Sequence, residues 1–139
     1  MIRRILAFIV VGTIGFIIDG GIVTLAVEVF KLNPYLSRAI SFPLAVTATW
    51  YLNRKWAFAT NATSQKKTEY TRYFIIQIIG ALINLAIYSL LIANIPLFAV
   101  HPILPLAIGS LIAMTFNFLG AQLFVFNRKH EPEDSVTAK

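Results

Sequence analysis

Residues Tyr73 to Asn127 read YFIIQIIGALINLAIYSLLIANIPLFAVHPILPLAIGSLIAMTFNFLGAQLFVFN and contain no Asp, Glu, Lys or Arg. A soluble domain needs charged side chains over its whole surface, typically about a quarter of its residues. In this chain of 139 residues, only 13% are charged, 58% are hydrophobic and none is cysteine. The composition therefore excludes a soluble globular domain and predicts an all-α membrane protein.

Four apolar stretches are long enough to cross a bilayer as helices, which takes roughly 20 residues each. They cover about residues 5–30, 36–58, 73–95 and 103–126. We expect residues 1–127 to form one transmembrane domain and residues 128–139 to form a polar cytoplasmic tail.

The lysines and arginines predict the orientation of these spans. Ten of them fall on one side of the predicted membrane, and only Lys31 and Arg38 fall on the other. Because cytoplasmic loops of membrane proteins are enriched in Lys and Arg, both termini are predicted to be cytoplasmic, which is an N-in, C-in topology. The net charge of +6 then lies at the lipid surface, so nucleic acid is a poor explanation for it.

The two halves of the chain show a weak internal similarity. A shift of 65 positions places Gly15 over Gly80 and Asp19 over Asn84, and a shift of 68 places residues 56–58 over residues 124–126. The first and third spans both run from inside to outside. The pattern predicts two two-helix repeats of the same orientation.

From Arg4 to Phe126, the chain resembles the GtrA-like family of small bacterial and archaeal membrane proteins. The residues that carry the resemblance are Phe8-x-x-x-Gly12 with Asp19 seven residues on, Leu52-Asn53-Arg54-Lys55-Trp56-Ala57-Phe58, Gly80-x-x-x-Asn84, Asn117-Phe118 and Phe124-Val125-Phe126. The second half departs from the family pattern, because Ala121 and Gln122 stand where an Asn-Arg pair is expected.

The resemblance implies translocation of a polyprenyl-phosphate-linked sugar across the cytoplasmic membrane, for modification of a cell-surface polysaccharide or glycopolymer. No bond is made or broken in such a step, so the chain is expected not to be an enzyme. The expected partners are the sugar lipid, membrane lipids and a membrane glycosyltransferase. Two alternatives remain open at this point: a small proton-coupled exporter of organic cations, and a non-transporting partner of a glycosyltransferase.

Asp19 is the candidate site residue that the membrane argument selects. It lies roughly 21 Å along a helix that starts at Ile5, where an ionised carboxylate costs roughly 2.5 to 3.5 kcal/mol. It must therefore face protein or water, as part of a substrate path or as a structural hydrogen-bonding group. Arg38 is its most plausible charged partner, although an arginine near a helix end also snorkels to the interface.

The other candidate substrate-binding residues are Asn53, Arg54, Asn84 and Asn117. Asn53 and Arg54 close the second span at the cytoplasmic side, where a guanidinium can bind a lipid phosphate or simply anchor the topology. Asn84 and Asn117 either hydrogen-bond between helices or line the same groove as Asp19.

The sequence offers no pattern for other chemistry. We find no Ser-His-Asp arrangement, metal-ligand cluster or nucleotide-binding loop, so neither catalytic residues nor cofactors are predicted. Four helices enclose little polar volume, and we therefore expect a homo-oligomer, most simply a parallel dimer.

Overall fold

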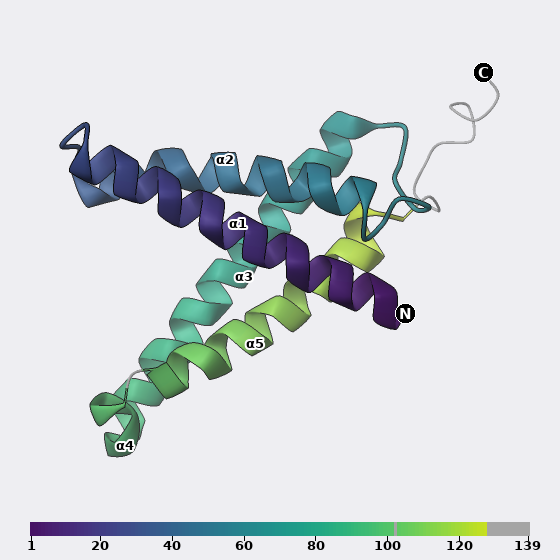
Figure 1. Cartoon of the computed structure of the whole chain (residues 1–139). Helices are drawn as coiled ribbons and strands as arrows, with labels where there is room; N and C mark the ends of the chain where they lie inside the picture. The colour runs from purple at the N-terminus through teal and green to yellow at the C-terminus, as the bar shows by residue number, and fades with distance from the viewer. Residues whose placement is uncertain (102, 128–139) are drawn as a thin grey trace. The chain divides into compact units, whose positions relative to one another are not determined.

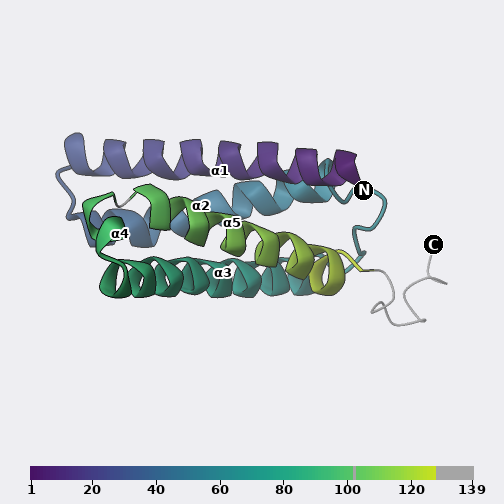
Figure 2. The same cartoon turned by 90° about the horizontal axis from the view of Figure 1, so that it is seen from below.

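The computed structural model describes residues 1–101 and 103–127, and within these residues the chain is helical with no strands (Figures 1 and 2). Its elements in chain order are α1 (Ile2–Glu28), α2 (Pro34–Lys55), α3 (Lys66–Asn94), the short α4 (Pro96–Val100), α5 (Ile103–Gly120) and a π-helical turn, η1 (Ala121–Val125). The described chain divides into two compact units: residues 1–66 with 126–127, and residues 67–125. The predicted polar tail, residues 128–139, lies outside the described residues.

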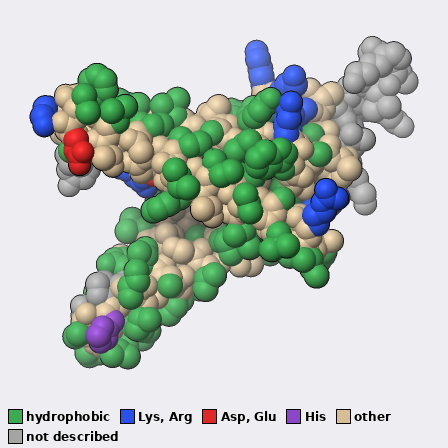
Figure 3. Space-filling model, in the orientation of Figure 1, with side chains coloured by type: hydrophobic (Ala, Val, Ile, Leu, Met, Phe, Trp, Pro, Cys, Tyr) green, Lys and Arg blue, Asp and Glu red, His purple; other side chains and the backbone are tan. Residues whose placement is uncertain are grey.

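Three helical segments in the described chain are long and apolar enough to cross a membrane, namely α1, α3 and the continuous segment Ile103–Val125. Large apolar side chains on them are exposed, for example Phe16 at 77% and Leu85 at 61%. Figure 3 shows hydrophobic side chains spread over the visible surface of the helices. The chain is therefore a membrane protein. The predicted second span, α2, has 22 residues but is more polar than the other three.

In the first unit, α1 and α2 lie side by side and antiparallel (Figures 1 and 2). The side of α1 that is buried carries Phe8, Val11, Gly15 and Ala26, at spacings that place residues on one helical face. Gly15 lies so close to Thr49 of α2 that a Cβ atom at this glycine would overlap the Thr49 methyl group. Small residues thus bring the two backbones together, as is common between membrane helices.

The turn between α1 and α2 has a defined geometry. Lys31 adopts a left-handed backbone conformation with φ of 53°, and the Leu32 N–H donates to the Ala26 carbonyl at 3.0 Å, which closes the end of α1. At the start of α2, the Asn33 side chain accepts a hydrogen bond from the Leu36 N–H at 3.0 Å, and Pro34 is the first helical residue. An asparagine cap followed by proline is a strong helix start.

In the second unit, α5 packs against α3 through two glycines that each accommodate an asparagine. A Cβ atom at Gly80 of α3 would overlap the Asn117 amide of α5, and one at Gly109 of α5 would lie 3.0 Å from the Asn84 carbonyl of α3. Gly80 contacts Asn117 and the later residue Asn84 contacts the earlier residue Gly109, so the two helices run antiparallel. After Asn94, Pro96 prevents α3 from continuing, and α4 forms the connection.

The helices differ from the predicted spans at their ends. α3 begins at Lys66 rather than near residue 73, because its first turns are polar and continue the helix beyond the apolar stretch. α2 ends at Lys55 rather than near residue 58, and the chain then folds back so that the Phe58 ring stacks on Phe126 with 4.7 Å between centroids. α4 and the π-helical turn were not predicted. In that turn, the Phe124 carbonyl accepts a hydrogen bond from Arg72 at 3.3 Å.

Candidate functional site

Asp19, Arg38 and Ser41 form a polar cluster between α1 and α2. Arg38 Nη1 forms an ion pair with Asp19 Oδ2. The other carboxylate oxygen, Oδ1, accepts a hydrogen bond from the Ser41 hydroxyl at 2.6 Å. We call these three residues the α1–α2 polar cluster. It places an ion pair on helices whose neighbouring exposed residues are mostly apolar.

The members of the cluster differ in accessibility. Ser41 is fully buried, the Asp19 side chain is 15% exposed, and the Arg38 side chain is 59% exposed. A carboxylate in an apolar region is stabilised only when it is paired and hydrogen-bonded, and both of its oxygens meet that requirement here. The group that the cluster offers to a ligand is therefore the guanidinium of Arg38.

Asn53 and Arg54 lie at the opposite end of α2, where Arg54 is sixteen residues and roughly 24 Å along the helix from Arg38. Asn53 is 1% exposed. Arg54 Nη2 donates to the Thr63 carbonyl at 2.7 Å, and Arg4 of α1 donates to the Asn61 side chain at 2.9 Å. Both arginines thereby hold the loop that follows α2.

Asn84 and Asn117 belong to the second unit, where they lie between α3 and α5. Asn117 Nδ2 donates to Gln77 Oε1 at 3.1 Å. The Oδ1 atoms of both asparagines are buried and accept no hydrogen bond from the described residues. Unpaired buried acceptors are unfavourable by about 1–3 kcal/mol each. Each amide therefore keeps one acceptor that the described residues leave unfilled.

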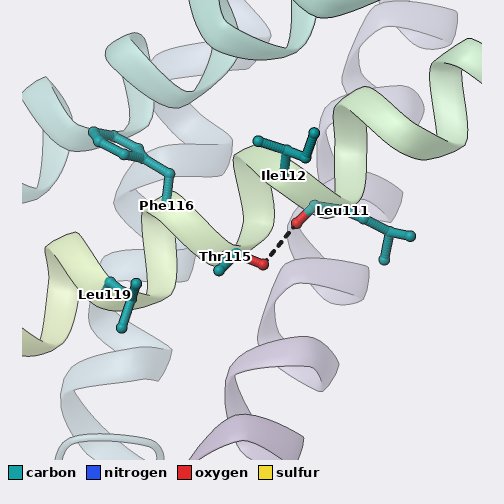
Figure 4. A pocket seen from close by; sticks show the side chains of 5 residues that line it. All are labelled: Leu111, Ile112, Thr115, Phe116 and Leu119. Atoms are coloured by element: carbon teal, nitrogen blue, oxygen red, sulfur yellow. Dashed lines mark hydrogen bonds between the residues drawn. The ribbon is translucent and has the colours of Figure 1, made fainter.

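The second unit also carries an apolar groove along α5, of about 390 Å³ and lined by Leu111, Ile112, Thr115, Phe116 and Leu119 (Figure 4). Its one hydroxyl, on Thr115, donates to the Leu111 carbonyl of the same helix at 2.9 Å. The groove thus presents no free polar group and no charge. It suits a hydrocarbon chain, whereas a sugar or phosphate requires polar partners.

The structure brings together one predicted pair, Asp19 with Arg38, and places Asn53 beside Arg54 at the other end of the same unit. Sequence reasoning missed Ser41 and Gln77. A four-residue spacing of small side chains in α2, Ser37-x-x-x-Ser41-x-x-x-Ala45, indicates a face in close helix contact, and this pattern contained the information needed to find Ser41. Gln77 was one helical turn before Gly80 and was the only other uncharged amide in the third apolar stretch besides Asn84 and Asn94.

These features define a small helical membrane protein with an ion pair between two packed helices. The chain belongs to the GtrA/DPMS transmembrane-domain family, whose model matches residues 7–126. The comparison with curated proteins found no match. Family membership makes this a membrane protein related to polyprenyl-phosphate sugars, in a family that is generally not catalytic.

Proposed function

We propose that this protein moves a polyprenyl-phosphate-linked sugar from the inner to the outer leaflet of the cytoplasmic membrane, for modification of a cell-surface polysaccharide or glycopolymer. The observation that carries the proposal is the α1–α2 polar cluster, in a chain that belongs to the GtrA/DPMS family. The family supplies the class of lipid, and the cluster supplies charged and polar groups for its head within an apolar helix pair.

The physical task in this proposal is to lower a desolvation barrier. The polyprenyl tail is apolar and remains in lipid throughout, and the open apolar surface of α5 provides a suitable neighbour for it. The sugar phosphate is the part that hydrocarbon excludes, because its hydroxyls and charge lose their hydrogen bonds to water. A protein that offers replacement partners along the path therefore accelerates the movement without chemistry.

The proposal includes α2 as a fourth span. Three of its polar side chains, Ser37, Ser41 and Asn53, are buried, whereas Leu36, Ile40 and Leu44 are exposed. An average over the helix therefore understates how apolar its outer surface is. The packing of α2 along α1 also supports this assignment, because a helix paired with a spanning helix shares its depth.

Corresponding contacts in the two units support the proposed repeat. Gly15 meets Thr49 in the first unit, and Gly80 meets Asn117 in the second; these pairs are related by the shifts of 65 and 68 positions. Asp19 contacts Ser41, and Asn84 contacts Gly109, with the same shifts. In each of these similar helix pairs, the first helix would cross the membrane outward and the second would return to the cytoplasmic side. This fits the N-in, C-in orientation proposed from the charges.

This topology can be tested by labelling single cysteines, since the natural chain has none. Ser64, in the loop after α2, and Val100, at the end of α4, are both exposed. In intact cells, a membrane-impermeant maleimide is expected to label Val100→Cys and to label Ser64→Cys only after the membrane is opened. Labelling of both positions from the same side would overturn the four-span orientation.

Within this proposal, Asn53 and Arg54 contact the lipid phosphate on the cytoplasmic side, and Asn84 and Asn117 contact sugar hydroxyls. For Asn84 and Asn117, the assignment is supported by a buried acceptor oxygen on each side chain that accepts no hydrogen bond from a described residue. We also propose that the working unit is a homo-oligomer and that a membrane glycosyltransferase uses the exported lipid. Crosslinking in native membranes is expected to give a dimer or a larger homo-oligomer.

The function is tested by reconstitution into liposomes with a labelled polyprenyl-phosphate sugar. Protein-dependent appearance of the label on the far leaflet, without similar movement of a labelled phosphatidylcholine, is the expected result. Uptake of organic cations driven by a proton gradient would instead identify an exporter. Activity in neither assay, together with co-purification of a glycosyltransferase, would identify a non-transporting partner, and either of these outcomes rejects translocation.

A further inference from the structure

We propose that Arg38 is a phosphate-binding residue at the α1–α2 loop side of the membrane, and that Asp19 is a latch that competes with the phosphate for it. The phosphate is one carried by a lipid at headgroup depth. That this lipid is the translocated sugar lipid rests on the proposed function, whereas the binding site itself does not.

Asp19 is not an open acceptor for a ligand. Its Oδ2 is paired with Arg38 and its Oδ1 with Ser41, whose hydroxyl is 2.6 Å away. The side chain is 15% exposed, and Ser41 is fully buried. A ligand that approached this face from lipid or water would therefore meet the guanidinium before the carboxylate.

Most of the hydrogen-bond donors of Arg38 are not engaged by the residues that the structure describes. Its side chain is 59% exposed, and of its five N–H groups only one, on Nη1, is engaged by the residues that the structure describes. A guanidinium presents pairs of parallel N–H groups that match two phosphate oxygens. The surroundings favour an anion, because Arg38 is in the second turn of α2, near the positive end of the helix dipole. The other charged residues at this end of the helix pair are Lys31 and Glu28, one of each sign.

The ion pair holds Arg38 away from the position that a lone arginine prefers. Ser41 is three residues, about 4.5 Å, further from the α1–α2 loop than Arg38. Because Ser41 fixes the carboxylate at its own level, Arg38 reaches across to α1 instead of extending toward the loop and the headgroups. Arginines near helix ends snorkel toward the interface, and helical side chains lean toward the N-terminus, which in α2 is the loop end.

Arg38 therefore has two arrangements: inward on Asp19, and outward on a phosphate. When a phosphate arrives, it replaces the carboxylate, and when the phosphate leaves, the carboxylate takes its place. Because the phosphate must displace the carboxylate, the free energy of phosphate binding is reduced by the free energy of the Asp19–Arg38 ion pair. A carrier needs this property, because a site that binds its lipid too tightly does not release it.

The test measures lipid binding in nanodiscs of phosphatidylcholine by native mass spectrometry, without any transport step. The probes are a polyprenyl phosphate, the matching neutral polyprenol and phosphatidic acid.

Relative to the natural protein, Arg38→Gln is expected to bind polyprenyl phosphate at least about tenfold more weakly, and Asp19→Asn about tenfold more tightly. Ser41→Ala keeps the carboxylate but loosens it, so an increase of about threefold is expected. Lys31→Gln, which removes a charge on the same side outside the cluster, is expected to change binding less than twofold, and polyprenol binding should be the same in all variants.

Weaker binding by Asp19→Asn would overturn the latch, because it would make the carboxylate part of the ligand site. If Asp19→Asn does not assemble, Ser41→Ala decides the question in the same way. An equal loss in Lys31→Gln and Arg38→Gln would overturn the site, since general surface charge would explain both. Equal binding of phosphatidic acid and polyprenyl phosphate would support the phosphate site and assign ordinary headgroups as its ligand. Stronger binding of polyprenyl phosphate would support the substrate lipid as the source.

Discussion

Replacing Arg38 with glutamine is expected to reduce sugar-lipid translocation at least about tenfold and to lower the free energy of unfolding by about 2 kcal/mol. The change removes the partner of Asp19 and leaves a mostly buried carboxylate with only the Ser41 hydroxyl. Breaking one side of a buried ion pair typically costs 3–5 kcal/mol, and the exposure of Arg38 reduces this value. Unfolding in mixed detergent micelles measures the stability, and the liposome assay measures transport.

The double variant Asp19→Asn/Arg38→Gln separates the two effects. Asn keeps the shape of Asp19, and with both residues neutral no unpaired charge is left in the helix contact, so stability should return to within about 1 kcal/mol of the natural protein. Transport should remain low, because the guanidinium is still absent. A double variant that regains both stability and transport would show that the cluster is structural only.

The second large effect is expected at Gly15, where α1 and α2 approach most closely. Gly15→Ala introduces a methyl group where the Thr49 Cγ2 atom lies. Thr49 cannot rotate freely to avoid it, because its hydroxyl donates to the Val46 carbonyl at 3.0 Å. Overpacking of this kind typically costs 1–3 kcal/mol, and since Asp19 is one turn away, transport should fall as well.

Two further variants make this prediction specific. Thr49→Ser removes the overlapping methyl group and keeps the hydroxyl, so Gly15→Ala/Thr49→Ser should recover most of the lost stability. Gly12→Ala is the matched control on the same helix, since no atom lies within 4 Å of a Cβ atom placed there. It should be neutral or stabilising by up to about 1 kcal/mol. If Gly12→Ala and Gly15→Ala destabilise equally, the packing of α1 on α2 is not as described.

Much of this architecture could be predicted from the sequence, because the hydrocarbon interior of a bilayer allows few structures of the chain. A continuous apolar run of about 20 residues is typical of a membrane-spanning helix, and a lone carboxylate such as Asp19 must find a partner within the membrane. For the same reason, Arg38 could be predicted as that partner. The ends of the helices were harder to predict, since α3 continues through Lys66 and Glu69, beyond the apolar stretch that marks the span.

The parts that were missed depend on which side of a helix faces its neighbour. Ser41 has no charge and fits equally well toward lipid, where a serine can bond to its own helix, so its type alone did not indicate a role. The same applies to Thr49 and Gln77, whose contacts depend on the helix register. Asn84 and Asn117 were predicted as polar groups between helices, but their placement opposite Gly109 and Gly80 required three-dimensional information.

The most direct test of the central claim measures how fast a labelled polyprenyl-phosphate sugar reaches the outer leaflet of proteoliposomes. The natural protein is compared with the Asp19→Asn/Arg38→Gln variant, at equal amounts of inserted protein and with protein-free liposomes as background. The account predicts exposure well above background for the natural protein and close to background for the variant. Equal rates for the two proteins, or no rate above background for the natural protein, would contradict it.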